Sequence, residues 1–339
     1  MAATLASAAD PDTLIGAGAT VRAALRVGAA ALEAAGVDSP AADAAWLLAS
    51  TLGLSRGALG LEPGRTLGPP HDVRYARSLW RRRGREPLQH ILGTQAFRDL
   101  TLRVGPDVLV PRPETELLVS WALELLPAPG TGPLVIDVGT GSGCIACALA
   151  SERPDVRVVA VDASPAAVAL ARENVAALGL ADRVTVAVSD LFSGLAPTRA
   201  DLVVSNPPYV PAPVIGTLAP EITGHEPRLA LDGGGDGLSV IRRLVQEAPR
   251  WLAPGAPLVL ETFGDAQVAE VMSLMQEAGF MSIVTRRDLA GVTRFVAALR
   301  SSAGFARATD SWGEAAERAA RPAERRKGGE APLRGPSCR

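Results

Sequence analysis

The chain has 339 residues, with 47% hydrophobic side chains, 21% charged side chains and a formal net charge of −2 at pH 7. This composition is that of an ordinary globular protein. It excludes both an intrinsically disordered chain and a chain whose overall charge would by itself bind nucleic acid. The length allows about two domains at the usual ~150 residues per domain.

The first quarter of the chain carries a helical pattern after a loose start. Residues 1–17 show no clear period and are expected to form an irregular lead-in. Apolar residues then recur every three or four positions over residues 21–36, which predicts a helix. Ser39, a capping residue that precedes a proline, begins a second helix, and residues 73–83 form a third amphipathic stretch. We therefore expect a small helical domain over residues 18–85.

Residues 86–118 differ from this pattern because apolar and polar side chains alternate there. Such alternation is typical of short strands with one buried face. We predict a β-hairpin linker over this range, leading into the next domain.

Residues 119–300 alternate between apolar runs and helical patterns. Seven strands are expected, at Leu134–Val138, Val156–Val161, Val184–Val188, Leu202–Ser205, Leu258–Thr262, Ser282–Thr285 and Thr293–Leu299. Helices are expected at Cys144–Ser151, Pro165–Leu178, Leu238–Trp251 and Ala266–Ala278. This alternation indicates an α/β fold with a parallel sheet covered on both faces, in which the last two strands pair antiparallel. Residues 301–339 have too few large apolar side chains to offset the entropy of ordering, and we predict that they are disordered.

A glycine-rich segment directly follows the first strand of this domain and consists of Gly139, Thr140, Gly141, Ser142 and Gly143. Glycine allows positive φ angles, and the helix that begins next presents free amides, so a ligand is expected there. A dinucleotide fingerprint would need glycine at position 144, which is Cys144. The spacing G-x-G-x-G after an acid, Asp137, instead resembles the loop of class I methyltransferases, whose cofactor S-adenosylmethionine carries an ammonium group. We expect Asp137 to hold that ammonium directly or through water.

Acidic residues also end the next two strands. Asp162 stands about twenty residues past the glycine loop, where a carboxylate can accept hydrogen bonds from both ribose hydroxyls. Asp190 ends the third strand, where an acid can bind the adenine amino group. The alternative is that each acid only caps the following helix, and Asp162 in particular stands shortly before Ser164 and Pro165.

The fourth strand ends in a stiff polar motif, Asn206, Pro207, Pro208 and Tyr209. Proline fixes φ and has no N–H, so the Asn206 side-chain oxygen and the Pro207 carbonyl can be held in rigid directions. Two such acceptors can bind both N–H groups of an amide or aromatic amine and direct its delocalised lone pair at a methyl donor. We predict that Asn206, Pro207 and Tyr209 are catalytic, with Tyr209 as a flat apolar wall.

These motifs resemble those of methyltransferases that act on planar nitrogens, and two further segments resemble the release factor glutamine methyltransferase family. The first runs from Pro87 to Gly93 and continues with Phe97 and residues 110–116, and the second covers residues 226–238. The resemblance extends from about residue 20 to residue 300 and implies a seven-stranded, Rossmann-like class I methyltransferase sheet behind a small helical domain.

The same resemblance implies methyl transfer from S-adenosylmethionine to the glutamine amide nitrogen in the Gly-Gly-Gln loop of a peptide chain release factor, which the helical domain docks. It assigns the residues from Gly139 to Gly143, together with Asp162 and Asn206, to the cofactor and those from Asn206 to Tyr209 to the glutamine amide. The resemblance places Leu191 at the wall of the adenine site, a position where some relatives carry an aromatic residue. Phe97, Arg112 and Glu114 shape the substrate entrance. For Glu114 the alternative is a plain acid at the positive end of a helix.

Two other functions stay open at this point. An adenine-N6 or guanine-N2 nucleic-acid methyltransferase would use the same chemistry, but it would need a basic, aromatic-bearing surface, and only the arginines between residues 74 and 85 offer one. These arginines are as readily explained by a solvated helix face, so stable nucleic-acid binding is not expected. A non-catalytic cofactor-binding adaptor would not need an intact motif at residues 206–209.

Cysteine and apolar spacing give the remaining expectations. No run of eighteen apolar residues and no leader-like start is present, so we expect no membrane association and a cytoplasmic protein. Three cysteines are too few for a disulfide framework. Cys144 and Cys147 lack a second ligand pair at zinc spacing, and the three histidines are widely separated, so no metal site is expected.

Overall fold

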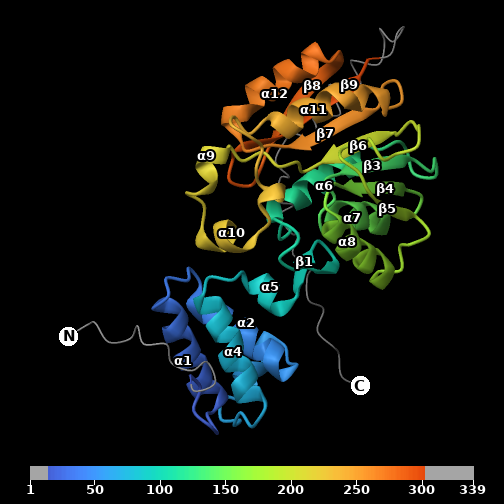
Figure 1. Ribbon diagram of the computed structural model, residues 1–339. Coiled ribbons are helices and arrows are strands. Elements are labelled where there is room, and N and C mark those ends of the chain that lie inside the picture. The colour runs from blue at the N-terminus through green and yellow to red at the C-terminus, as the bar shows by residue number, and fades with distance from the viewer. Residues whose placement is uncertain (1–13, 302–339) are drawn as a thin grey trace, which may run out of the picture.

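The computed structural model describes residues 14–301, which form a small helical lobe and a larger α/β lobe (Figure 1). The expectations for residues 1–13 and 302–339 lie outside this range. Within it, no helix is long and apolar enough to cross a membrane.

The helical lobe consists of α1 (Val21–Glu33), α2 (Pro40–Leu52), α3 (Arg56–Leu61) and α4 (His71–Arg83). Local signals set the helix ends. Thr20 caps α1 by accepting a hydrogen bond from the Ala23 amide, and Gly53 ends α2 in the left-handed conformation. Tyr75 of α4 is fully buried, and its hydroxyl donates to the Ala44 carbonyl at 3.2 Å. An N-terminal helical region therefore precedes the α/β lobe, as the periodicity indicates.

The segment between the lobes differs from the expected run of short strands. It contains α5 (Leu88–Leu92), the hairpin of β1 (Thr94–Phe97) and β2 (Leu100–Arg103), and then α6 (Pro113–Leu125). The hairpin is correct, but the strand pattern is wrong on both sides of it. Pro113 at the first helical position and Glu114 in the first turn favour a helix, and α6 then packs against the sheet. Five residues are too short for α5 to show a helical period.

The seven predicted strands are all present, as β3 (Leu134–Val138), β4 (Arg157–Asp162), β5 (Val184–Val188), β6 (Leu202–Ser205), β7 (Pro257–Glu261), β8 (Phe280–Arg287) and β9 (Thr293–Arg300). They form one sheet in the order β5-β4-β3-β6-β7-β9-β8. The first five strands of this order are parallel, and β9 is antiparallel to both β7 and β8. The prediction of a seven-stranded, mostly parallel sheet with an antiparallel final pair is confirmed.

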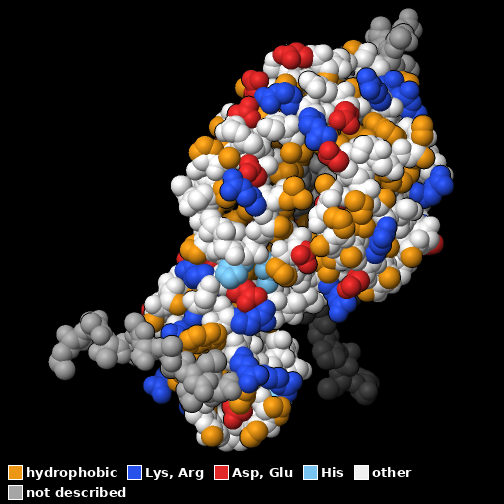
Figure 2. Space-filling model, viewed as in Figure 1, with side chains coloured by type: hydrophobic (Ala, Val, Ile, Leu, Met, Phe, Trp, Pro, Cys, Tyr) orange, Lys and Arg blue, Asp and Glu red, His pale blue; other side chains and the backbone are white. Residues whose placement is uncertain are grey.

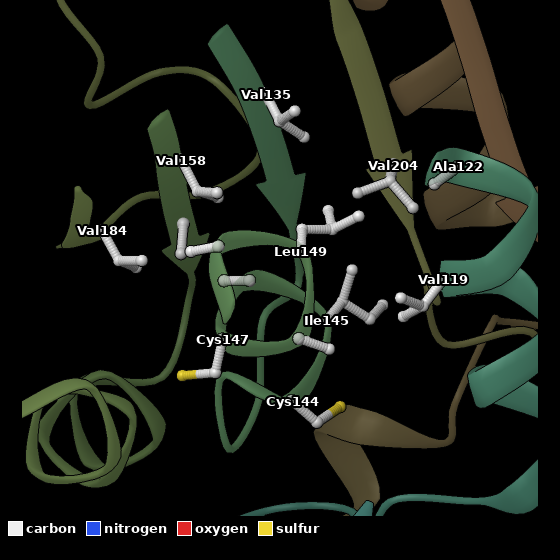
Figure 3. Packing of buried hydrophobic residues seen from close by; sticks show 14 of the residues in the cluster. Val119, Ala122, Val135, Cys144, Ile145, Cys147, Leu149, Val158, Val184 and Val204 are labelled. Carbon is white, nitrogen blue, oxygen red and sulfur yellow. The ribbon is translucent and has the colours of Figure 1, made fainter. Parts of the chain in front are cut away.

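Helices cover both faces of the sheet, and each face has its own apolar core. The covering helices are α6, α7 (Cys144–Glu152) and α8 (Pro165–Ala177) on one face and α11 (Ser239–Glu247) and α12 (Asp265–Glu277) on the other. Figure 3 shows Ile145 and Leu149 of α7 between the valines of the strands and Val119 of α6. Burial on both faces explains why the central strands β3, β6 and β7 are nearly continuous apolar runs.

The loop after β6 carries two short helices, α9 (Ala212–Ile215) and α10 (Pro220–His225), and the 3₁₀ turn Arg228–Ala230. Figure 1 shows α10 at the side of the α/β lobe that faces the helical lobe. The buried guanidinium of Arg82 on α4 pairs with Asp43 and with Glu221 of α10, each at 2.8 Å, and Arg85 pairs with the other Glu221 oxygen at 2.7 Å. Histidine side chains lie at this junction (Figure 2), and His225 Nε2 is 3.1 Å from the Gly84 carbonyl.

Candidate active site

A cavity of about 580 Å³ lies at the carboxyl ends of β3, β4, β5 and β6. Its wall is formed by the loops after these strands, the first turn of α6 and the segment after α10. This is where open α/β sheets bind their ligands, and the volume lies in the usual range for small-molecule sites. The cavity therefore joins the glycine loop to the Asn206 motif.

The glycine loop forms one wall of this cavity. Gly139, Gly141 and Gly143 all have positive φ angles, of 73°, 55° and 82°. No atom lies within 4 Å of the position that a Cβ on Gly141 would occupy, so bare backbone faces open space there. Thr140 and Ser142 also line the cavity, and the buried Ser142 hydroxyl has no hydrogen-bond partner among the described residues.

Gly143 does not line the cavity and has a packing role instead. A Cβ at this position would lie 3.3 Å from the Cβ of Ala171 on α8. The third glycine therefore allows α7 and α8 to approach closely behind the loop.

Asp137 lies beneath the loop and is not among the cavity-lining residues. Its side chain is fully buried, and its Oδ2 accepts a hydrogen bond from Thr140 Oγ1 at 2.6 Å. Burial raises the pKa of this carboxyl from 3.8 to about 7. Asp137 thus holds the loop from behind through Oδ2, while its buried Oδ1 has no hydrogen-bond partner among the described residues.

Asp162 does line the cavity and connects two loops. Its Oδ2 accepts from the Gly141 amide and its Oδ1 from the Ser164 amide, both at 2.9 Å. The side chain that caps α8 is Ser164, which accepts from the Ala167 amide at 3.2 Å. The plain capping alternative thus applies to Ser164, and Asp162 stands at the cavity with both oxygens already held in place.

Asp190 and Leu191 form the far end of the cavity. Asp190 is paired with Arg243 of α11 at 2.9 Å, a partner that the sequence did not suggest. Leu191 has an unusual positive φ of 49° and is largely buried, with its carbonyl accepting from the Ser189 hydroxyl at 2.8 Å. Its side chain contributes an apolar wall, together with Val240 and Leu244 of α11.

The Asn206 motif forms another part of the cavity wall. Asn206, Pro207 and Pro208 line the cavity, and a Cβ on Gly139 would lie only 3.9 Å from the Asn206 carbonyl oxygen. The Asn206 Nδ2 donates to Thr115 Oγ1 at 3.0 Å, whereas its Oδ1 has no donor among the described residues. The Pro207 carbonyl likewise accepts no backbone hydrogen bond in residues 14–301. Two acceptors are therefore available beside the glycine loop.

Tyr209 occupies a different place from the predicted cavity wall. Its hydroxyl donates to Glu261 Oε1 at 3.0 Å, and its ring lies 6.2 Å from that of Phe263. It is absent from the cavity lining, because the chain turns after Pro208 and directs the ring into the neighbouring apolar cluster. Tyr209 supports the motif and does not face the cavity.

Of the residues predicted to shape the substrate entrance, only one lines the cavity. Phe97 is 1% exposed within the core beneath α6, so its assignment to the entrance is wrong. The last residue of β1 points inward in the strand alternation, which gives Phe97 this place. Glu114 stands in the first turn of α6 and does not line the cavity, as the helix-end alternative indicates. Arg112 does line the cavity and pairs with the buried Glu226 at 2.6 Å.

Two buried residues at or behind the site could not be found from the expected motifs. Glu261 is a buried acid at the end of β7, and the strand-end rule that found Asp162 and Asp190 could have found it. Thr115 lies in the segment 110–116, but no local signal in the sequence shows that it contacts Asn206, which is 91 residues away.

The glycine-rich segment 233–237 packs behind the Asn206 motif. Gly237 has a φ of 78°, and a Cβ there would lie 2.4 Å from the Tyr209 carbonyl oxygen. The Gln267 amide donates to the Tyr209 carbonyl at 2.9 Å and to the Asp236 carbonyl at 3.2 Å. This close backbone packing fixes the chain where it leaves the Asn206 motif.

Comparison with known proteins gives concordant matches on both lobes. Residues 115–287 match the family model described as methyltransferase small domain, and residues 23–93 match the PrmC N-terminal domain. The release factor glutamine methyltransferase of Geobacter sulfurreducens is 42% identical over 261 residues, which cover 77% of this chain and 90% of the relative. The same-named enzyme of Cereibacter sphaeroides is 43% identical, covering 81% and 96% of the two chains.

A solved structure shows the same fold at low identity. The catalytic domain of hMettl16, in complex with a MAT2A 3′UTR hairpin, is 15% identical, with a TM-score of 0.51 over 70% of this chain and 86% of that chain. A likeness at this level concerns the fold alone.

Proposed function

This chain belongs to the release factor glutamine methyltransferase family, and from that membership we propose how its residues methylate the side-chain amide of glutamine in the Gly-Gly-Gln loop of a peptide chain release factor. The enzyme depends on S-adenosylmethionine, which supplies an electrophilic methyl group on a sulfonium when it is bound.

The residues of the cavity fit that cofactor. Gly141 offers a bare backbone surface, and the buried Ser142 hydroxyl is available to a polar group. Asp162 holds a carboxylate at the end of β4, where it can accept from ribose hydroxyls. Leu191 and Leu244 supply an apolar wall for a planar base. Together these residues would hold the cofactor along the carboxyl edge of the sheet.

The substrate amide needs acceptors because its nitrogen lone pair is delocalised into the carbonyl. Asn206 Oδ1 and the Pro207 carbonyl can each accept one N–H of a carboxamide, which positions the nitrogen and stabilises the positive charge that it develops. The single observation that carries this proposal is the hydrogen bond from Asn206 Nδ2 to Thr115, because it leaves Oδ1 as the unpaired end of a side chain that lines the cavity. The site residues require no metal for this chemistry.

The protein partner is proposed to bind across both lobes. The cavity opens beside the segment after α10, and α10 is the element that Arg82 and Arg85 of the helical lobe contact. A release factor that docks on the helical lobe would thus be held beside Pro227 and Leu229, which line the cavity. From such a substrate we infer that the enzyme acts in the cytoplasm.

The test is a methyl-transfer assay with labelled S-adenosylmethionine and purified release factor. We expect label in the wild-type release factor and none in a release factor whose Gly-Gly-Gln glutamine is replaced by alanine. DNA and RNA should stay unlabelled under the same conditions. Label that appears in nucleic acid only would overturn the assignment.

A further inference from the structure

A buried chain of hydrogen bonds stands behind the free end of Asn206. Asn206 Nδ2 donates to Thr115 Oγ1 at 3.0 Å, and Thr115 Oγ1 donates to Glu261 Oε2 at 2.9 Å. Thr115 is 2% exposed and Glu261 is 1% exposed. These hydrogen bonds therefore connect the end of β7, through the first turn of α6, to the Asn206 motif, and their Thr115 and Glu261 members are buried from solvent.

The direction of these hydrogen bonds follows from the chemistry of their last member. An ionised carboxylate can only accept hydrogen bonds, so the Thr115 hydroxyl donates its hydrogen bond to the ionised form of Glu261. The Thr115 oxygen then has only lone pairs to offer Asn206, which must present its NH2 group. Since the two ends of a carboxamide have nearly the same shape, packing alone would not distinguish them.

We propose that Glu261 and Thr115 are positioning residues that determine which end of the Asn206 carboxamide faces the substrate. This inference rests on the proposed function, in which Asn206 Oδ1 accepts an N–H of the glutamine amide. With the amide reversed, two NH2 groups would face each other and the substrate would lose an acceptor. Glu261 thus acts through Thr115 and Asn206 without touching the reacting atoms.

A second contact ties the same carboxyl group to the other end of the motif. Glu261 Oε1 accepts from the Tyr209 hydroxyl at 3.0 Å, so one buried group holds both Asn206 and Tyr209. Arg294 of β9 and Glu114 of α6 are the charged groups whose fields reach Glu261, and Arg294 is itself paired with Asp288 at 2.9 Å. Burial raises the pKa of Glu261 to about 7, so the ionised form that sets the direction is well populated at neutral and higher pH.

The hydrogen bonds that connect Glu261 to Asn206 through Thr115 can be tested with two matched variants of Thr115. Thr115→Val keeps the shape of the side chain but removes both hydrogen bonds, whereas Thr115→Ser keeps the hydroxyl. For Thr115→Val we expect kcat for the release factor to fall by about 10- to 100-fold, with the cofactor Kd unchanged within about twofold. Thr115→Ser should recover most of kcat. A folded Thr115→Val enzyme with wild-type kcat, or a serine variant as slow as the valine variant, would contradict the proposal.

A spectroscopic measurement separates this inference from the proposed function. The chain contains only two asparagines, Asn174 and Asn206, so labelling with ¹⁵N-asparagine gives two side-chain NH2 pairs. Asn174 Nδ2 donates to the Ser142 and Arg103 carbonyls and is the internal control. In Thr115→Val we expect the Asn206 pair to shift and exchange faster with solvent while the Asn174 pair is unchanged.

The two outcomes can be told apart because the spectrum needs no substrate. If the wild-type enzyme methylates no release factor but the Asn206 signals depend on the Thr115 hydroxyl, the orientation stands and the proposed function fails. If the release factor is methylated and the Asn206 signals are the same in Thr115→Val and wild type, the proposed orienting role of Thr115 and Glu261 is overturned and the proposed function stands.

Discussion

At the scale of single residues, the site depends on carboxyl groups that are buried and held by hydroxyl groups. Asp137 accepts from Thr140, and Glu261 accepts from Thr115 and Tyr209. Burial raises the pKa of both carboxyls to about 7. Neither group faces the cavity, so each acts on the site by holding a loop. Because burial disfavours their ionised forms, these carboxyls reduce the free energy of unfolding at neutral pH. Their hydrogen bonds hold the glycine loop and the Asn206 motif in place.

Asp137→Asn should therefore have a stability effect that depends on pH. The unfolded chain ionises this carboxyl near pH 4 and the folded protein near pH 7, so the wild-type protein loses folding stability as the pH rises through this window. Asparagine cannot ionise, so the unfolding free energy of the variant relative to wild type should increase by about 3 kcal/mol between pH 4 and pH 8.

The measurement is urea denaturation at several pH values. Asp182→Asn is the control, because its carboxylate is 74% exposed and its replacement should change stability little at any pH. A difference between Asp137→Asn and wild type that stays constant from pH 4 to pH 8 would argue against an ionisable buried group.

At the scale of elements, the segment 233–237 is proposed to fix the catalytic loop through backbone contacts alone. Gly237→Ala would place a Cβ 2.4 Å from both the Tyr209 carbonyl oxygen and Gln267 Nε2, at a backbone φ of 78°. We expect a loss of about 1–3 kcal/mol in stability and a fall of at least tenfold in kcat, since the loop must shift.

Gly235→Ala is the matched control for this prediction. It lies in the same segment, but no atom is within 4 Å of its added Cβ. Steady-state methylation kinetics and thermal unfolding of both variants measure the effect. Equal behaviour of the two variants would show that close packing at Gly237 is not what holds the loop.

The contact between α4 and α10 is the second prediction at this scale. Arg82→Met removes a buried cation and leaves Asp43 and Glu221 without their shared partner, which should cost about 3 kcal/mol of unfolding free energy. The control Arg65→Met breaks the exposed pair with Glu62 and should cost less than about 1 kcal/mol. Denaturant unfolding measures both.

Loss of the contact between α4 and α10 should also weaken binding of the release factor. Residues that follow α10 line the cavity, and Glu226 there holds Arg112. We expect the KM for the release factor to rise in Arg82→Met while the cofactor Kd stays near wild type. An unchanged KM in a destabilised variant would separate the lobe contact from substrate binding.

At the scale of the whole molecule, the sheet could be predicted from sequence because its strands are rich in apolar residues, which are almost wholly buried in the central strands β3, β6 and β7 and partly buried in the outer strands β5 and β8. Each predicted strand differs from the observed one by at most a few residues at either end. The elements that were missed, such as α5 and α10, have only five and six residues, too few for a period. In α6 the start signals at Pro113 outweigh the apparent alternation.

The site could be predicted in part for a related reason. Parallel strands bring their carboxyl ends to one edge, so Asp162, Asp190 and Asn206 could be placed together from their positions alone. Which way a side chain points was harder to predict. Phe97 and Tyr209 lie in apolar clusters, and Thr115 meets Asn206 only because α6 packs beside β6 and β7. Such contacts depend on tertiary packing, which leaves no periodic trace in the sequence.

The most direct test of the central claim is mass spectrometry of the Gly-Gly-Gln peptide of release factors from cells with and without this gene. We predict a methylated glutamine with the intact gene, an unmodified glutamine after deletion, and restoration by the wild-type chain but not by Asn206→Ala. The restored cells must contain comparable amounts of both proteins. A glutamine that is unmodified in wild-type cells, or that is methylated as fully by Asn206→Ala as by the wild type, would contradict this function.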